Sequence, residues 1–297
     1  MKPSELFPDF APERRHVNGV DICFRQGGSG PALLLLHGFP QTHGIWHRVA
    51  PRLAQRFRIV MPDLRGYGDS GKPPSDAEHA PYSKRVMARD MVELMHALGH
   101  ERYFVCGHDR GGRVAHRLAL DHPRDVMRLM VLDISPTRTM YERTTMEFAR
   151  LYYHWFFLIQ PAPLPETLIG ADPGFYLRTK LGAWSSSGTS AFDARALSEY
   201  QRCFTTDAIH AMCEDYRAAA SIDLEHDRAD EASRIGCPVH VLWGERGVVH
   251  RLFAPLADWR DKATGAVTGR TLPCGHFIPE EQPDAFVDEA AAFFMGD

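Results

Sequence analysis

The sequence predicts an α/β fold in which a mostly parallel sheet is covered by helices on both faces and interrupted by an inserted helical segment. Three observations support this prediction. Short apolar runs alternate with amphipathic stretches along most of the 297 residues, as in repeated strand–helix units. The run at 33–36 consists of four leucines, which suits a strand that is buried on both faces. Between about residues 137 and 225, aromatic residues and prolines are frequent and no strong strand pattern occurs.

The elements follow in order from local signals. A hairpin is predicted over residues 14–25, because Asn18-Gly19 separates two alternating stretches. Apolar spacing predicts a helix over 45–53, and Ser83 is a candidate cap for an amphipathic helix that ends near Leu98. Strands are expected at 31–36, 57–62, 103–107, 128–133, 238–244 and 267–272, and further helices at 114–120 and 283–294. We therefore expect an α/β core of residues 1–136 and 226–297 and an α-helical cap of residues 137–225.

Composition and charge give no indication of a membrane protein, a nucleic-acid-binding protein or a metalloprotein. The net charge of −4 gives no reason to expect nucleic acid or an anionic membrane as a partner. No run approaches the roughly 20 apolar residues of a spanning helix, and residues 1–6 lack the apolar region of a secretory signal. The six cysteines are scattered, and the sixteen histidines show no ligand spacing. We expect reduced thiols, a cytoplasmic location, and neither a metal nor a cofactor.

Polar residues end several of the predicted parallel strands. His37, Asp63, Asp109 and Asp133 each follow an apolar run. The carboxyl ends of parallel strands share one edge of the sheet, where sites of such folds lie. This edge is therefore the predicted functional site.

The most informative stretch is residues 107–112, GHDRGG. A strand leads into it and a helix pattern follows, so the glycines fit a tight turn in which neighbouring backbones approach closely. The residue at the centre is Asp109. A carboxylate can attack carbon without a base to deprotonate it, so this position suits displacement at an alkyl carbon. The alternative is an ordinary strand-to-helix turn with Asp as a helix cap.

Four motifs together resemble the α/β-hydrolase family over nearly the whole chain. They are HGFP at 37–40, DLRGYGDS at 63–70, GHDRGG at 107–112 and CGHF at 274–277. With Asp at the centre of the turn, the sequence resembles the branch that contains haloalkane dehalogenases, epoxide hydrolases and fluoroacetate dehalogenases. It resembles the fluoroacetate dehalogenases most.

The resemblance implies catalytic roles for three side chains. Asp109 is the expected nucleophile, His276 the base that activates water, and Asp133 the acid that orients His276. Glu245 stays open as an alternative to Asp133, although Gly247 stands where many relatives have an Asp. The backbone N–H groups of Phe39 and Arg110 are the expected oxyanion hole.

Arginines and cap residues point to the substrate. Arg110 and Arg113 lie one helical turn apart beside the nucleophile, so both can grip one carboxylate. The alternative is a surface helix with basic residues. The resemblance assigns the halide to three hydrogen-bond donors, which can replace the water around a departing fluoride. These donors are His154, Trp155 and Tyr216.

The expected activity is therefore hydrolysis of fluoroacetate or other 2-haloacetates through an ester on Asp109, and the resemblance suggests a homodimer. His108 and Trp184 are further candidates for the pocket. An epoxide hydrolase, with Tyr216 and either Tyr152 or Tyr153 as acids, is the alternative enzyme. A catalytically inactive receptor of the same fold is the non-enzymatic alternative.

Overall fold

The computed structural model describes residues 6–296 and confirms the predicted fold class. Eight strands form one sheet in the order β1-β2-β4-β3-β5-β6-β7-β8. The pairs β1/β2 and β2/β4 are antiparallel, and every pair from β4 to β8 is parallel. Residues 1–5 and 297 lie outside the described part. The prediction that the N-terminus is not a secretory signal, and the outermost limits of the predicted core, fall on these residues.

The strands are β1 (Pro12–Val17), β2 (Val20–Gly27), β3 (Ala32–Leu36), β4 (Arg58–Pro62), β5 (Tyr103–His108), β6 (Val126–Leu132), β7 (Val239–Gly244) and β8 (Val267–Leu272). The core helices are η2 (His43–Trp46), α1 (Ala50–Leu53), η3 (Ala80–Tyr82), α2 (Lys84–Ala97), α3 (Arg110–Asp121), α12 (Val248–Leu252), α13 (Pro255–Arg260), α14 (Ile278–Glu281) and α15 (Pro283–Met295). Between β6 and β7 lie α4 (Thr137–Glu142), α5 (Met146–Leu151), α6 (His154–Phe157), α7 (Leu164–Gly170), α8 (Pro173–Trp184), η4 (Gly188–Ala191), α9 (Ala194–Cys203), α10 (Thr206–Ala220) and α11 (Ile222–Ala229).

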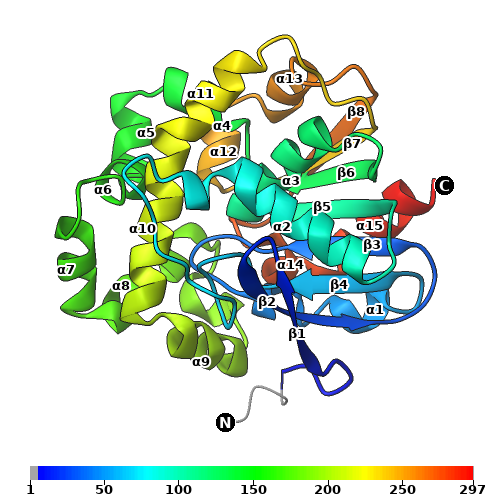
Figure 1. Ribbon diagram of the computed structural model, residues 1–297, viewed down its shortest axis with the longest axis horizontal. Coiled ribbons are helices and arrows are strands. Elements are labelled where there is room, and N and C mark those ends of the chain that lie inside the picture. The colour runs from blue at the N-terminus through cyan, green and yellow to red at the C-terminus, as the bar shows by residue number, and fades with distance from the viewer. Residues whose placement is uncertain (1–5, 297) are drawn as a thin grey trace.

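Helices cover the sheet from both sides. In Figure 1, α2 and α3 cross the near face of the sheet, whereas α1 and α15 lie behind it. Phe294 of α15 packs on Phe57 and Phe104, which ties α15 to the far face. Every residue of β3 and β5 is buried, because a central parallel strand is covered on both faces.

Local signals explain most element boundaries. Ser83 caps α2, where its hydroxyl accepts a hydrogen bond from the Val86 N–H. The continuous helix predicted over 45–53 is wrong. The chain instead forms the short 3-10 helix η2 and then the single turn α1, with Pro51 in the first turn of α1. Proline has no N–H to continue a helix, so it starts a new one here.

The helices α4 to α11 follow β6 and precede β7, and in Figure 1 those from α5 to α10 gather on the left of the sheet. They carry the aromatic residues that the sequence predicts for the site, among them Trp155, Trp184 and Tyr216. Among residues 6–296, no helix is both long enough and apolar enough to cross a membrane. All six cysteines are free thiols, as expected.

Candidate active site

The turn at Asp109 has the strained geometry predicted for a nucleophile. Strand β5 ends at His108, α3 begins at Arg110, and Asp109 between them has φ of +46°. Such a positive φ is costly for a residue with a side chain and persists where the surroundings enforce it. A Cβ on Gly107 would lie 2.5 Å from the carbonyl oxygen of Gly111, so a larger residue would displace α3. The glycines therefore allow strand and helix to meet tightly enough to project Asp109.

Asp109 is buried but ionised. Its Oδ1 accepts a hydrogen bond of 2.9 Å from the Phe39 N–H, and its Oδ2 lies 3.9 Å from His276 Nε2. Burial alone would raise the pKa of Asp109, but the charges of His276 and Arg113 outweigh it and hold the pKa below its ordinary value. The carboxylate is thus available as a nucleophile, with one oxygen already fixed by the backbone.

Asp133 holds the histidine. Its Oδ2 lies 2.6 Å from His276 Nδ1, while its Oδ1 accepts the Gly244 N–H at 3.0 Å. The alternative acid, Glu245, is exposed and lies 3.9 Å from Arg246. A Cβ on Gly247 would be 3.3 Å from both Asp133 oxygens, so glycine at this position leaves room for the Asp133 carboxylate.

The His276 loop is fixed from two more sides. His108 Nε2 donates to the His276 carbonyl oxygen at 2.9 Å, and the His276 N–H donates to the Trp184 carbonyl at 2.8 Å. Burial would lower the pKa of His276, but the hydrogen bond and charge of Asp133, together with Asp109, raise it above its ordinary value. Burial lowers the pKa of His108 to about 3, so His108 is neutral and positions the loop.

Arg110 is anchored by an acid that the sequence did not reveal. The carboxylate of Asp215 on α10 accepts hydrogen bonds from Arg110 Nε at 2.8 Å and from Nη2 at 2.9 Å. The backbone carbonyl of Asp215 accepts a further hydrogen bond from Nη2 at 2.7 Å. Both side chains are fully buried. Arg110 also stacks on Tyr216, 4.1 Å from the ring centroid. Its Nη1 has no hydrogen-bond partner among residues 6–296, so this nitrogen is available to donate to a ligand.

Arg113 reaches the same region from the next turn of α3. Its Nη1 donates to Thr137 Oγ1 at 2.9 Å and to the Ser135 carbonyl at 3.2 Å. Its guanidinium lies over the Trp155 ring, 4.7 Å from the centroid. Arg113 is almost fully buried, so the reading as a basic surface helix is wrong. The charges of both arginines act on Asp109.

All three predicted halide donors are buried, and two of them, His154 and Tyr216, lie close together. The ring of His154 lies 5.6 Å from that of Tyr216 and is followed in sequence by Trp155. Within the described chain, Nδ1 of His154, Nε1 of Trp155 and the hydroxyl of Tyr216 have no hydrogen-bond partner. Buried polar groups normally have one, so these donors are available to a ligand. Burial, first among several causes, lowers the pKa of His154 well below its ordinary value, so the imidazole is neutral.

Two tyrosines and a tryptophan complete the surroundings. Tyr141 was not predicted; its ring lies 4.8 Å from Trp155, and its hydroxyl also has no partner in the range 6–296. No motif marks it, although its position shortly after β6 places it near the site edge of the sheet. Trp184 lies 4.4 Å from His154 and 5.7 Å from His276, centroid to centroid, and therefore bridges the donor group and the base. Tyr153 is 44% exposed, unlike the buried Tyr152.

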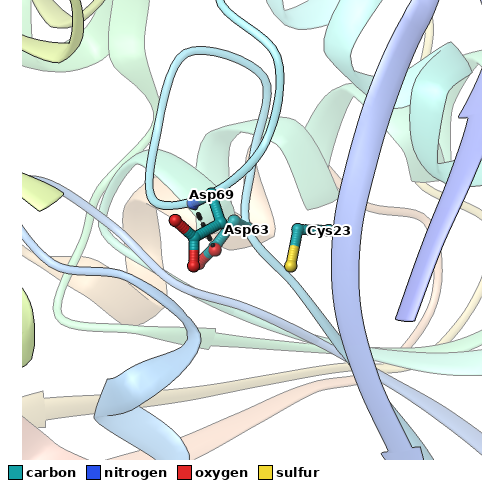
Figure 2. Close-up of side chains that lie close together, drawn as sticks. All are labelled: Cys23, Asp63 and Asp69. Atoms are coloured by element: carbon teal, nitrogen blue, oxygen red, sulfur yellow. Dashed lines mark hydrogen bonds between the residues drawn. The ribbon is translucent and has the colours of Figure 1, made fainter. Parts of the chain in front are cut away.

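A separate polar cluster supports the loop after β4. Cys23, Asp63 and Asp69 lie close together, with side-chain ligand atoms within 4.8 Å of one another (Figure 2). The Asp63 oxygens already accept hydrogen bonds from His43 and from the Asp69 N–H, and Asp69 pairs with Arg202. These bonds use the carboxylates to brace the loop, so we assign the cluster a structural role.

This arrangement brings together the side chains predicted for an Asp-nucleophile hydrolase, and the sequence comparison gives the family. The family model described as alpha/beta hydrolase fold matches residues 31–283, and the chain belongs to this family. The family supports a hydrolase.

Individual relatives narrow the resemblance. The chain is 48% identical to a fluoroacetate dehalogenase from Burkholderia sp. over 92% of its length and 90% of the relative's. It is 34% identical to a soluble epoxide hydrolase from Corynebacterium sp. (strain C12), covering 94% and 95% of the two chains. A solved structure of a putative alpha/beta hydrolase from Nostoc sp. PCC 7120 superposes with a TM-score of 0.96 at 54% identity, covering 98% of this chain and 100% of that one. The resemblance to fluoroacetate dehalogenases is confirmed at the level of sequence.

Proposed function

We propose that the protein hydrolyses the carbon–halogen bond of fluoroacetate and other 2-haloacetates to give glycolate and a halide ion. The observation that carries this proposal is the pair of buried guanidiniums, Arg110 and Arg113, beside the Asp109 carboxylate. A substrate with its own negative charge is repelled by Asp109, so it needs cations to bind there. The guanidinium fork also matches a carboxylate in shape.

In the first step, Asp109 attacks the α-carbon of the haloacetate. A C–O bond forms as the carbon–halogen bond breaks, and the halide leaves with the bonding electron pair. We assign Oδ2 as the attacking oxygen because Oδ1 accepts the Phe39 N–H. Arg110 Nη1 and Arg113 hold the substrate carboxylate and align the α-carbon with Asp109. Such alignment of the reacting atoms can by itself lower the activation barrier substantially. The product is a glycolyl ester on Asp109.

The departing halide is received by His154, Trp155 and Tyr216. Fluoride is small and strongly hydrated, so it leaves into a dry pocket only where donors replace its water. Support for this role comes from the polar atoms of all three side chains that find no hydrogen-bond partner among the residues the structure describes. Donors fixed in advance stabilise developing charge without reorganisation.

In the second step, His276 takes a proton from water, and the resulting hydroxide adds to Cγ of Asp109. Negative charge develops on Oδ1, where the Phe39 N–H already donates, and we assign the Arg110 N–H as the second donor. Collapse of this intermediate breaks the Cγ–Oδ2 bond. Glycolate leaves with Oδ2 and takes the proton of the new Cγ hydroxyl, the oxygen from water completes the Asp109 carboxylate, and His276 releases its proton to solvent. Asp133 keeps the Nδ1 proton of His276 in place, so Nε2 faces the water.

An epoxide hydrolase is the second candidate. The buried hydroxyls of Tyr141 and Tyr216, which have no hydrogen-bond partner in the described part of the chain, favour it, because such phenols can protonate an epoxide oxygen. However, a neutral epoxide gives Arg110 and Arg113 no anion to bind. We therefore place haloacetates first.

The test measures halide release from fluoroacetate and chloroacetate, diol formation from epoxides, and the mass of the protein after incubation with substrate. We expect halide release, and we expect a His276→Asn variant to retain a glycolyl group on Asp109. An Asp109→Asn variant is the control and should show no adduct. Diol without halide would replace the proposal by the second candidate. If neither halide nor diol is released and no adduct forms, the catalytically inactive receptor is the remaining alternative.

We also propose that the protein forms a homodimer and works in the cytoplasm. Support for self-association comes from large exposed apolar side chains on α7 and α8, Leu164, Leu168 and Phe175. The free thiols are consistent with a reducing compartment. Light scattering of the purified protein tests the oligomeric state.

A further inference from the structure

A buried glutamate joins three parts of the active site. Glu280 of α14 follows His276 by four residues and is fully buried. Its Oε1 accepts a hydrogen bond of 3.0 Å from Gln41 Nε2 and another from the Tyr200 hydroxyl. Gln41 lies in the loop that carries Phe39, and Tyr200 lies on α9 of the cap. One carboxyl group therefore links the oxyanion loop, the cap and the loop of the catalytic histidine.

The pattern of satisfied and unsatisfied atoms indicates the protonation state of this group. Within residues 6–296, Glu280 Oε2 and Gln41 Oε1 are both buried acceptors without a partner. They belong to side chains that are already joined through Gln41 Nε2 and Glu280 Oε1. A proton on Glu280 Oε2 would turn the two side chains into a carboxylic acid–carboxamide pair and satisfy both oxygens. An ionised Glu280 would instead leave two buried acceptors unmet, which is unfavourable.

The charges around Glu280 do not offset its burial. Arg48 donates to the backbone carbonyl of Glu280 at 2.6 Å, so its nearest hydrogen bond is to the backbone and not to the carboxyl group. Asp193 at the start of α9 and Glu281 on α14 add negative charge nearby. Burial, aided by these acids and opposed by Tyr200 and Arg48, raises the pKa of Glu280 to about 8. On the neighbouring α15, Asp284 pairs with Arg52.

We propose that protonated Glu280 is a positioning residue that clamps the oxyanion loop and the His276 loop against the cap, and that its deprotonation in alkaline solution releases the clamp and stops turnover. The links to the reacting groups are short. The Gln41 N–H donates to the Gly38 carbonyl at 2.9 Å, one residue from Phe39. The Glu280 N–H donates to the Phe277 carbonyl at 2.9 Å, next to His276. A charge on Glu280 therefore changes the positions of the Phe39 N–H, which is the oxyanion donor, and of His276, which is the base.

The decisive variant is Glu280→Gln, because an amide reproduces the protonated acid. Its Nε2 can donate to Gln41 Oε1, while its Oε1 keeps accepting from Gln41 and Tyr200. We expect the wild type to lose kcat as pH rises through about 8, and Glu280→Gln to keep it. Glu101→Gln, which changes an exposed glutamate, is the matched control and should behave as the wild type.

Tyr200→Phe gives a second, independent readout. The Tyr200 hydroxyl lowers the pKa of Glu280, so its removal should move the alkaline loss of kcat to higher pH. A purely structural role of Tyr200 would lower activity without moving the pH profile. Lys180 is also buried, and burial lowers its pKa to about 7, so it is a second group that titrates in this pH range. Lys180→Met is therefore measured as well. The proposal requires that this variant still lose kcat in alkaline solution.

Only the kcat part of the test rests on the proposed function. The other part follows the melting temperature across pH and needs no substrate. Glu280 binds its proton more tightly in the folded chain than at its ordinary pKa of 4.5, so its own contribution to stability falls as pH rises from that value to about 8, with a slope of one proton. Glu280→Gln should remove that slope. If the variant keeps both the slope and the alkaline loss of kcat, the clamp is refuted. If haloacetates are not turned over but the slope disappears, the clamp stands and the proposed substrate fails.

Discussion

Replacing Asp215 by asparagine tests whether Arg110, the proposed ligand of the substrate carboxylate, depends on its buried partner. The Asp215 carboxylate receives two hydrogen bonds from the Arg110 side chain and also pairs with Lys84, and all three side chains are 5% exposed or less. Removing one partner of a buried ion pair costs about 3–5 kcal/mol, because the remaining charge is left uncompensated. Here two cations lose the same partner, so we expect Asp215→Asn to lower the free energy of unfolding by about 4–5 kcal/mol.

Activity should fall with stability in this variant. The Asp215 carboxylate fixes the plane of the guanidinium, so its loss lets Nη1 of Arg110 move away from the substrate. A displacement of about 1 Å at a reacting centre can cost about 100-fold in rate, and we expect a loss of this order in kcat/KM for haloacetates. Urea denaturation followed by tryptophan fluorescence and steady-state kinetics measure the two effects.

Asp223→Asn is the matched control for this variant. Asp223 lies 3.4 Å from Lys84 Nζ but makes no contact with Arg110 among the hydrogen bonds and ion pairs of residues 6–296. It should therefore cost less stability and leave kcat/KM nearly unchanged. If Asp215→Asn lost less than about 1 kcal/mol, or no more than the control, Arg110 would not depend on this pair.

Two further predictions concern the halide donors and the base. Trp155→Phe removes one donor while keeping an aromatic ring, so kcat for fluoroacetate should fall about 100-fold and kcat for bromoacetate much less, since bromide needs fewer donors; equal losses would speak against a halide role. The pKa of His276 is raised and that of Asp109 is lowered, so in mild acid the ester should still form while its hydrolysis slows. Rapid-mixing measurements at low pH should then show a burst of halide equal to the enzyme concentration, and a linear time course without a burst would contradict this order of steps.

The fold and the proximity of Asp109, Asp133 and His276 were predictable because their signals are local. Glycines around Asp109 mark a turn that few other residues permit, and the rule that sites lie at the carboxyl ends of parallel strands places Asp133 beside it. The His276 loop carries its own short motif. Each of these inferences needs only neighbouring residues and the alternation of strands and helices, both of which the sequence contains.

The supporting residues depend on packing between distant segments and could not be predicted in this way. Asp215 lies next to the predicted Tyr216, yet nothing nearby shows that its partner is Arg110, 105 residues earlier. A charged residue among apolar neighbours on α10, such as Ala211 and Met212, was the available signal. Glu280 was not predicted for the same reason, since its partners Gln41 and Tyr200 lie far from it in sequence, on the loop after β3 and on α9.

The charges of the site also set the order of the two proposed steps. In the free enzyme, the Asp109 carboxylate helps to raise the pKa of His276, so a protonated imidazole is favoured next to it. A protonated imidazole cannot act as a base, but it does not prevent Asp109 from attacking carbon. Formation of the ester removes the charge of Asp109, so the pKa of His276 must fall, and the imidazole becomes able to take a proton from water. The nucleophile thus controls the base electrostatically, and water is activated only after there is an ester to hydrolyse.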